Sequence, residues 1–131
     1  MSALVADQHQ SIVVVEDDAG MSRAIQRLLR AAGFQSTSFA SAEELLKTDA
    51  VDSAACLVLD IHLPGLSGLE LARLLVTSGR AKPVIFITGH DETSLRDEAQ
   101  RLGCAYFRKP FKGKELLEAI RGLVTVGQIK Q

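Results

Sequence analysis

The chain has 131 residues, 47% of them hydrophobic and 24% charged, with a formal net charge of −1 at pH 7. This length predicts one domain with its own core, and the near-neutral charge argues against a surface built to bind nucleic acid. No apolar run approaches the ~18 residues of a membrane span, and residues 1–10 lack the basic start and long apolar segment of an export signal. We therefore expect a cytoplasmic protein without membrane contact.

Strand and helix signals alternate along the chain. Short apolar runs predict strands, and apolar side chains at helical spacing predict the helices between them. Two helix starts have the spacing of a capping box, in which a serine is followed three residues later by a glutamate. In chain order the expected elements are strand 11–15, helix 21–32, edge strand 35–39, a helix from Ser41, strand 55–60, helix 67–78, strand 83–88, helix 92–102, strand 104–108 and helix 112–124.

This alternation predicts a parallel sheet covered by helices on both faces and joined by right-handed crossovers. Five such units fit an α/β, flavodoxin-like doubly wound fold, (βα)5, with strand order 2-1-3-4-5. We expect the domain to span residues 11–124, with an N-terminal tail at 1–10 and a C-terminal tail or linker start at 125–131.

The two cysteines, Cys56 and Cys104, lack the spacing of a zinc site, and we interpret them as small buried apolar residues. In the predicted order another strand separates their strands. Their backbones would lie about 10 Å apart, beyond the ~7 Å reach of a disulfide.

Polar residues follow the strands at their carboxyl ends: Glu16, Asp17, Asp60, Thr88 and Lys109. Each alone could be a loop residue or a helix cap, as we expect for Asp18. Together they should converge at the crevice where the winding of the sheet reverses. Three carboxylates there would repel, so we expect at least one raised pKa without metal and a site suited to Mg²⁺. The added ammonium and hydroxyl predict Mg²⁺-dependent phosphorylation of Asp60.

Four stretches carry a family resemblance: VVEDD, LVLDIHLPGLSGLEL, VIFITGHDE and YFRKPF. They are similar to the response-regulator receiver domain of two-component signalling, the CheY-like family. The resemblance implies that Asp60 is the phosphoacceptor. It also implies that Glu16 and Asp17 organise Mg²⁺ together with Asp60 and the backbone carbonyl of His62. Glutamate at position 16 replaces the family's commoner aspartate and keeps the carboxylate.

The same resemblance assigns roles to residues beyond the acidic cluster. Thr88 would contact a phosphoryl oxygen and reorient on activation, and Lys109 would pair with the phosphoryl group. The Lys109–Pro110 peptide would be cis. Tyr106 would be a switch aromatic that moves between exposed and buried states, the alternative being a strand aromatic packed against a helix.

The resemblance also implies partners. The donor would be a histidine kinase or a phosphotransfer protein, and the output surface would be the last two helices and the strand between them, 92–124. That surface would contact an output domain or effector, and a second copy of the chain on phosphorylation. Stretches like VIFITGHDE also occur in receivers of LuxR-type transcription regulators. The chain contains no helix-turn-helix candidate, so we expect no direct nucleic-acid binding.

His62 and His90 occupy positions that in this family tune the loss of the phosphoryl group, although both could simply point into solvent. We hypothesise that their protonation, near the ordinary imidazole pKa of about 6.5, changes the lifetime of phospho-Asp60. A dephosphorylation rate that is flat from about pH 5.5 to 8, and unchanged in a His62→Ala, His90→Ala double variant, would contradict this.

Two alternative functions remain. A haloacid-dehalogenase-like phosphatase also places a nucleophilic aspartate after an apolar strand, but it needs a second aspartate where this chain has His62. A degenerate receiver would act as a binding module without phosphorylation, but here all five site positions carry suitable residues.

Overall fold

The structure, a computed structural model, describes residues 11–90, 93–103 and 105–129, and within these ranges the side chains as far as Val124. The predictions for residues 1–10, for Cys104 and for the end of the C-terminal tail lie outside the described residues. Within them, five strands form one sheet in the order β2-β1-β3-β4-β5, which confirms the predicted topology. The strands are β1 (Ser11–Val15), β2 (Gln35–Phe39), β3 (Ala54–Asp60), β4 (Val84–Thr88) and β5 (Ala105–Arg108).

The strands pair in parallel, and their register brings their carboxyl ends level. Val15 of β1 lies opposite Leu59 of β3, so Glu16 and Asp60 follow at the same height. Asp60 in turn lies opposite Ile87 of β4, and Thr88 lies opposite Arg108 of β5. The residues expected to form a site are therefore delivered to one edge of the sheet by strand pairing alone.

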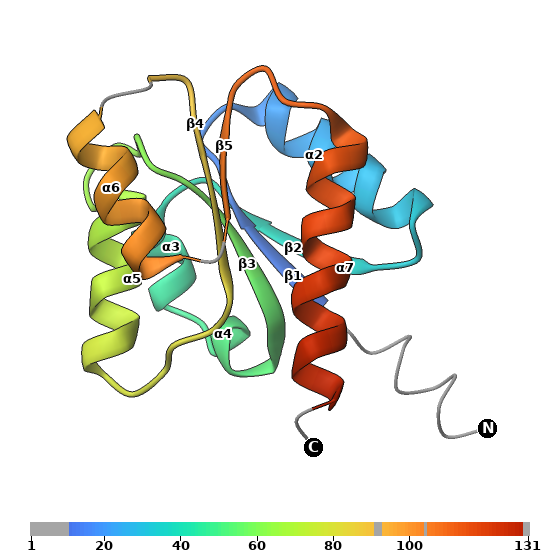
Figure 1. Ribbon diagram of the computed structural model, residues 1–131. Helices are drawn as coiled ribbons and strands as arrows, with labels where there is room; N and C mark the ends of the chain where they lie inside the picture. Colours follow the sequence, from blue (N-terminus) through green and yellow to red (C-terminus); the bar gives the residue numbers. More distant parts are fainter. Residues whose placement is uncertain (1–10, 91–92, 104, 130–131) are drawn as a thin grey trace.

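Six helices are described: α2 (Ala19–Ala31), α3 (Ala42–Leu46), α4 (Ala50–Ser53), α5 (Gly68–Thr77), α6 (Thr93–Leu102) and α7 (Gly113–Ile129). Figure 1 shows α2 and α7 on one face of the sheet and α3, α5 and α6 on the other. The sequence did not predict α4, because a single turn is too short to show a helical period. α7 continues past the expected end at 124 as far as Ile129.

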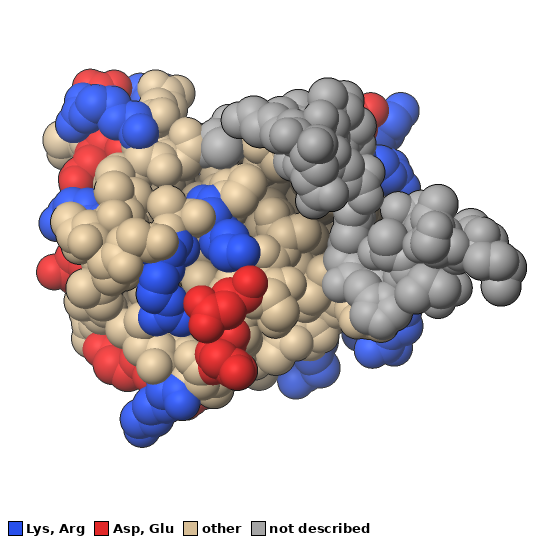
Figure 2. Space-filling model, turned by 90° about the horizontal axis from the view of Figure 1, so that it is seen from below, with Lys and Arg blue, Asp and Glu red and all other residues tan. Residues whose placement is uncertain are grey.

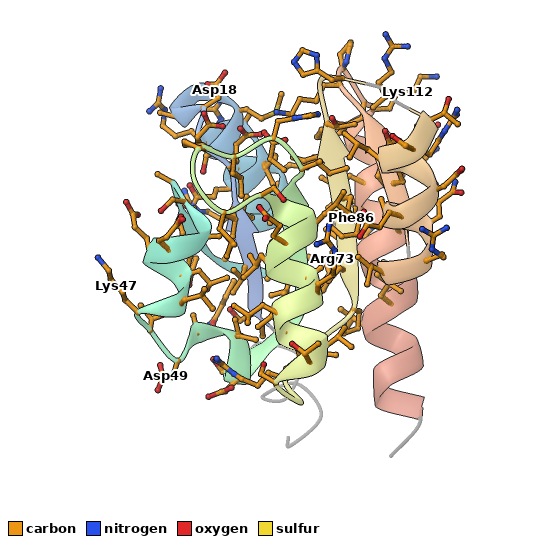
Figure 3. The ribbon with its side chains drawn as sticks, turned by 90° about the vertical axis from the view of Figure 1, so that its left-hand side faces the viewer. Asp18, Lys47, Asp49, Arg73, Phe86 and Lys112 are labelled. Carbon is orange, nitrogen blue, oxygen red and sulfur yellow. The ribbon has the colours of Figure 1, made fainter. Side chains whose placement is uncertain are left out.

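A hydrophobic layer lies on each side of the sheet. Leu57, Leu71 and Phe86 belong to the layer beneath α3, α5 and α6, and Figure 3 shows Phe86 on the side of the sheet that faces these helices. Ile25 and Ile120 belong to the layer beneath α2 and α7. The three central strands read as unbroken apolar runs because each is buried on both faces. Cys56 is fully buried in the second layer, as predicted.

The two capping-box predictions have different outcomes. At α5 the box is complete, since Ser67 Oγ accepts from Glu70 N–H at 3.1 Å and Glu70 accepts from Ser67 N–H at 2.9 Å. At α3, Ser41 Oγ accepts from Glu44 N–H at 3.1 Å. However, the Glu44 carboxylate returns to the N–H of Ala40, at 3.4 Å, so the prediction of a reciprocal pair at Ser41 was wrong.

Asp18 caps α2, as the sequence predicted, because its carboxylate accepts from Gly20 N–H at 2.9 Å and Met21 N–H at 3.2 Å. We expect Asp18→Ala to lower the free energy of unfolding by ~1 kcal/mol, measured by urea denaturation. Asp49 is a matched control: it precedes α4 but makes no capping bond with its side chain, and it lies at the opposite end of the molecule (Figure 3). An equal loss in Asp49→Ala would show that the effect is not capping.

The edge of the sheet away from the carboxyl ends carries mixed charge. Figure 2 shows acidic and basic side chains intermixed on this side of the molecule, outside the grey residues. One contact there is an ion pair of 3.3 Å between Arg80 Nε and Asp52 Oδ1, and Lys82 Nζ also donates to the Asp52 carbonyl at 3.1 Å. Among the helices of the described part, none combines the length and apolarity that crossing a membrane requires.

Candidate functional site

Three carboxylates meet at the carboxyl ends of β1 and β3. Glu16 and Asp17 directly follow β1, Asp60 ends β3, and one oxygen from each lies within 4.8 Å of the others. Glu16 and Asp60 are buried, whereas Asp17 is exposed to solvent. The predicted convergence of the three acids is thus confirmed.

The segment after Asp60 turns back tightly on that residue. His62 N–H donates to Asp60 Oδ1 at 3.0 Å, and Gly68 N–H donates to the Ile61 carbonyl at 3.0 Å. A Cβ built on Gly68 would lie 2.2 Å from the Asp60 carbonyl oxygen, so only glycine permits this approach. The backbone therefore fixes one oxygen of the Asp60 carboxylate and places His62 at the rim.

Lys109 holds the other side of the two buried carboxylates. Its Nζ lies 2.7 Å from Glu16 Oε1 and 3.0 Å from Asp60 Oδ2. The Lys109 backbone N–H donates to the Thr88 carbonyl at 2.7 Å, which anchors the residue beside β4. The Lys109–Pro110 peptide is cis, as predicted.

The balance of charge in this cluster is negative, because one ammonium faces three carboxylates. Burial raises the pKa of Glu16 to about 7, against the hydrogen bonds from Lys109 and from Asp18 N–H that lower it. Burial alone would lower the pKa of Lys109, but its bonds to Glu16 and Asp60 outweigh burial and raise that pKa. Lys109 therefore stays charged, and the expectation of a raised carboxyl pKa is confirmed at Glu16.

The residues present suit a hard divalent cation. The cluster offers carboxylate oxygens, which Mg²⁺ prefers, and the exposure of Asp17 leaves one side of the cluster open to the waters that Mg²⁺ retains. A hollow of about 250 Å³ adjoins Glu16 and Asp17 and is lined further by Arg23, Gln26 and Ser38. The acidic cluster is therefore open to solvent on the side of Asp17.

The raised pKa of Glu16 predicts how stability depends on pH when no divalent cation is added. Between the ordinary glutamate pKa of 4.5 and about 7, the folded protein binds more protons at Glu16 than the unfolded chain does. The free energy of unfolding should therefore fall as pH rises through this window, by on the order of 2–3 kcal/mol, and then level off. Urea denaturation across this range measures it.

A Glu16→Gln variant is the control for this titration, because glutamine cannot titrate and stays neutral throughout. Its stability should not show the decline between about pH 4.5 and 7 that we assign to Glu16. The same decline in Glu16→Gln as in the wild type would place its origin at another group.

Thr88 is fully buried at the end of β4. Its hydroxyl donates to the His90 carbonyl at 2.9 Å and accepts from His90 N–H at 3.0 Å. The structure therefore places Thr88 beside the acidic cluster, as predicted, but its side-chain hydroxyl is engaged with its own loop. To donate to another group, this hydroxyl has to give up its bond to the His90 carbonyl.

His62 and His90 meet at the rim of the site. Both residues are exposed, yet their rings contact each other edge to face, with centroids 4.8 Å apart and planes at 78°. The backbone N–H groups of His62 and His90 bond to Asp60 and Thr88, so both residues lie beside the site. The exposure of both residues fits the alternative that the imidazoles point into solvent. Their effect on the lifetime of a phosphoryl group stays a prediction.

Tyr106 lies on β5, partly buried against the layer beneath α3, α5 and α6. This placement fits the simpler alternative of a strand aromatic that packs against helices. Its predicted movement between exposed and buried positions stays a prediction, because one conformation does not test it.

One contact near the site was not predicted from the sequence. Glu43, in the first turn of α3, accepts a hydrogen bond from Leu66 N–H at 2.8 Å, in the loop after Asp60. The two residues are 23 positions apart, and an acid near a helix start is ordinarily explained by the helix dipole. The sequence marks Glu44, three residues after Ser41, as a capping residue, but it contains no local signal for the role of Glu43.

Comparisons with known proteins agree with this geometry. The family model for the response regulator receiver domain matches residues 12–121. Nodulation protein W of Bradyrhizobium diazoefficiens is 42% identical over 83% of this chain and 48% of that protein. The transcriptional regulatory protein FixJ of the same organism is 35% identical over 86% of this chain and 56% of its own length.

A solved structure is similar over most of the chain. The response regulator receiver protein from Burkholderia phymatum is 37% identical, with a TM-score of 0.76, over 88% of this chain and 95% of that chain. By contrast, the chain spans only about half the length of the curated relatives it matches.

Proposed function

Since the chain belongs to the response-regulator receiver domain family of two-component signalling, we propose that it accepts a phosphoryl group on Asp60 in a Mg²⁺-dependent reaction. The observation that carries the proposal is the position of Lys109 Nζ, between Glu16 Oε1 at 2.7 Å and Asp60 Oδ2 at 3.0 Å. It places a fixed positive charge against the carboxylate that would receive the phosphoryl group.

The residues that would hold Mg²⁺ are the carboxylates of Glu16, Asp17 and Asp60, with the backbone carbonyl of His62. Asp17 is the expected direct ligand among the acidic pair, because it is exposed and makes no ion pair among the described residues. Mg²⁺ bound there would neutralise the carboxylates and supply positive charge to the phosphoryl oxygens.

In the reaction, an oxygen of the Asp60 carboxylate forms a bond to the phosphorus of the donor as the bond from phosphorus to the leaving group breaks. The His62 N–H orients the Asp60 carboxylate through its bond of 3.0 Å to Oδ1. The Lys109 ammonium then exchanges a carboxylate partner for a phosphoryl oxygen, which stabilises the charge that develops there.

Phosphorylation would be transmitted through Thr88. The added phosphoryl group brings roughly −1.5 to −2 charge to the site and three acceptor oxygens. These oxygens would draw the Thr88 hydroxyl away from His90, to which it is bonded at 2.9 and 3.0 Å. Movement of this loop, with Tyr106 on the neighbouring strand, would change the surface formed by α6, β5 and α7.

The expected partners follow from this role. A histidine kinase or phosphotransfer protein would donate the phosphoryl group, and an output domain or effector would read the surface of α6, β5 and α7. The relatives that the chain matches are about twice as long as this chain. We therefore propose that the output domain belongs to the same polypeptide. One relative is named a transcriptional regulator, so we propose transcription as the output. A second copy of the chain is the other candidate for this surface.

Incubation with acetyl phosphate tests the proposed function. The wild-type protein should gain the mass of one phosphoryl group in the presence of Mg²⁺, and a chelator should prevent the gain. An Asp97→Asn variant, which changes an exposed acid on α6, should behave as the wild type does. Absence of the gain would favour a receiver that binds without phosphorylation. Repeated turnover of a phosphomonoester would favour a phosphatase.

A further inference from the structure

A side chain of α3, that of Glu43, forms a hydrogen bond with the loop between β3 and α5. Glu43 Oε2 accepts from Leu66 N–H at 2.8 Å. Seen in Figure 3, this loop lies at the upper end of the molecule, where α3 begins. The bond is charge-assisted, since the acceptor is a carboxylate, and such bonds are shorter and stronger than those between neutral groups.

Gly65 of the loop lies against the carboxylate of Glu43. Gly65 has φ of +73°, which favours glycine, and a Cβ built there would lie 2.5 Å from Glu43 Oε2. The carboxylate therefore lies directly against the backbone at Gly65 and reaches the next N–H. Two features of the backbone, its positive φ and its close approach to Glu43, suit glycine at this position.

The same loop carries two groups of the site. It begins at Asp60, and the carbonyl of His62 is the expected backbone ligand of the cation. Its base is closed by the bond of 3.0 Å from Gly68 N–H to the Ile61 carbonyl. Glu43 supplies a second attachment, on the far side of the loop from that closure, so the loop is fixed at two points.

α3 is itself tied to the other half of the acidic cluster. Glu16 N–H donates to the Phe39 carbonyl at 3.0 Å, at the end of β2. Ser41 then caps α3, accepting from Glu44 N–H at 3.1 Å. Glu43 lies in the turn that this cap fixes. A short run of bonded backbone therefore connects Glu16 with the loop that follows Asp60.

We propose that Glu43 is a positioning residue for phosphorylation: it fixes the loop that carries the His62 carbonyl and so sets the affinity of the site for Mg²⁺. The proposal rests on the proposed function, since it assumes that the cation binds at Glu16, Asp17 and Asp60. Glu43 touches neither the cation nor the phosphoryl group. Glu43 acts through the backbone of residues 62–66. Without Glu43, the binding of Mg²⁺ would have to order this loop, and the free energy of binding would be less favourable.

Glu44 provides a matched control. It lies in the same first turn of α3 and is exposed like Glu43, but its carboxylate accepts from Ala40 N–H at 3.4 Å instead of from the loop. Removing either acid takes the same charge from the amino end of the helix. Glu43→Ala and Glu44→Ala should therefore have similar stability, measured by urea denaturation. Only Glu43→Ala should lower the affinity of the site for Mg²⁺.

The experiment is a titration with Mg²⁺, followed by the backbone amide NMR signals of residues 60–68. Glu43→Ala should bind Mg²⁺ about tenfold more weakly than the wild type, as loss of an outer partner of a ligand commonly does. Glu43→Gln, which keeps an acceptor oxygen, should recover part of the loss, and Glu44→Ala should match the wild type. With acetyl phosphate, Glu43→Ala should need more Mg²⁺ to reach half its maximal rate.

Equal Mg²⁺ affinities in Glu43→Ala, Glu44→Ala and the wild type would overturn the proposal. Failure of the wild type to accept a phosphoryl group would instead contradict the proposed function. In that case, weaker Mg²⁺ binding by Glu43→Ala than by Glu44→Ala would still support the positioning role, because the titration needs no phosphoryl donor.

Discussion

An Asp60→Asn variant will gain no phosphoryl group from acetyl phosphate under conditions that fully phosphorylate the wild type. The amide of asparagine lacks the negative charge that makes an aspartate oxygen nucleophilic. The substitution is close in shape, and its oxygen can still accept from His62 N–H, the bond that measures 3.0 Å in the wild type. Loss of phosphorylation would therefore reflect lost chemistry and not a lost fold. Intact-protein mass spectrometry measures it.

The control for this variant is Asp18→Asn. Asp18 lies two positions from Glu16 and is acidic, but its carboxylate bonds to Gly20 and Met21 N–H at the start of α2. Asp18→Asn should accept one phosphoryl group at close to the wild-type rate. Equal loss in both variants would mean that the total charge of the segment matters and that Asp60 has no special role.

A Lys109→Met variant is expected to change two properties in opposite directions. It removes the only cation that contacts Glu16 and Asp60 among the described residues. Mg²⁺ should then bind more tightly, because no ammonium competes for the two carboxylates. Phosphorylation should nevertheless slow, by on the order of 10²-fold, because the charge that would stabilise the phosphoryl oxygens is gone.

This opposition distinguishes a role in the reaction from a structural role. A Mg²⁺ titration gives the affinity, and the time course of the mass gain at saturating Mg²⁺ gives the rate. Arginine at position 109 keeps the positive charge but presents a planar fork instead of a compact ammonium, so Lys109→Arg should recover little of the rate. If Lys109→Met weakened Mg²⁺ binding, or left the rate unchanged at saturating Mg²⁺, Lys109 would not have the assigned role.

Much of the fold could be predicted because the three central strands are buried on both faces. Val13, Leu57 and Ile85 each lie in an unbroken apolar run, and such runs identify strands of a parallel sheet with little ambiguity. The meeting of Glu16, Asp17 and Asp60 followed from the same step. Once the strand order is known, parallel register brings the strand ends to one edge.

The features that escaped prediction depend on short segments or on side-chain orientation. α4 is a single turn. α7 continues through Gly127 to Ile129, although glycine ordinarily destabilises a helix, so the sequence predicted an earlier end. The ring contact between His62 and His90 and the bond from Leu66 N–H to Glu43 join separate segments. Neither pairing leaves a periodic or local trace in the sequence, because both depend on how loops lie in the folded protein.

The position of the phosphoryl group is the most direct test of the central claim. After phosphorylation by acetyl phosphate with Mg²⁺, reduction with borohydride traps an acyl phosphate, and peptide mass spectrometry then locates the altered residue. The account predicts one altered site, Asp60, in the wild type and none in Asp60→Asn. An altered residue at Glu16 or Asp17, or a phosphoryl group on a hydroxyl side chain, would contradict it.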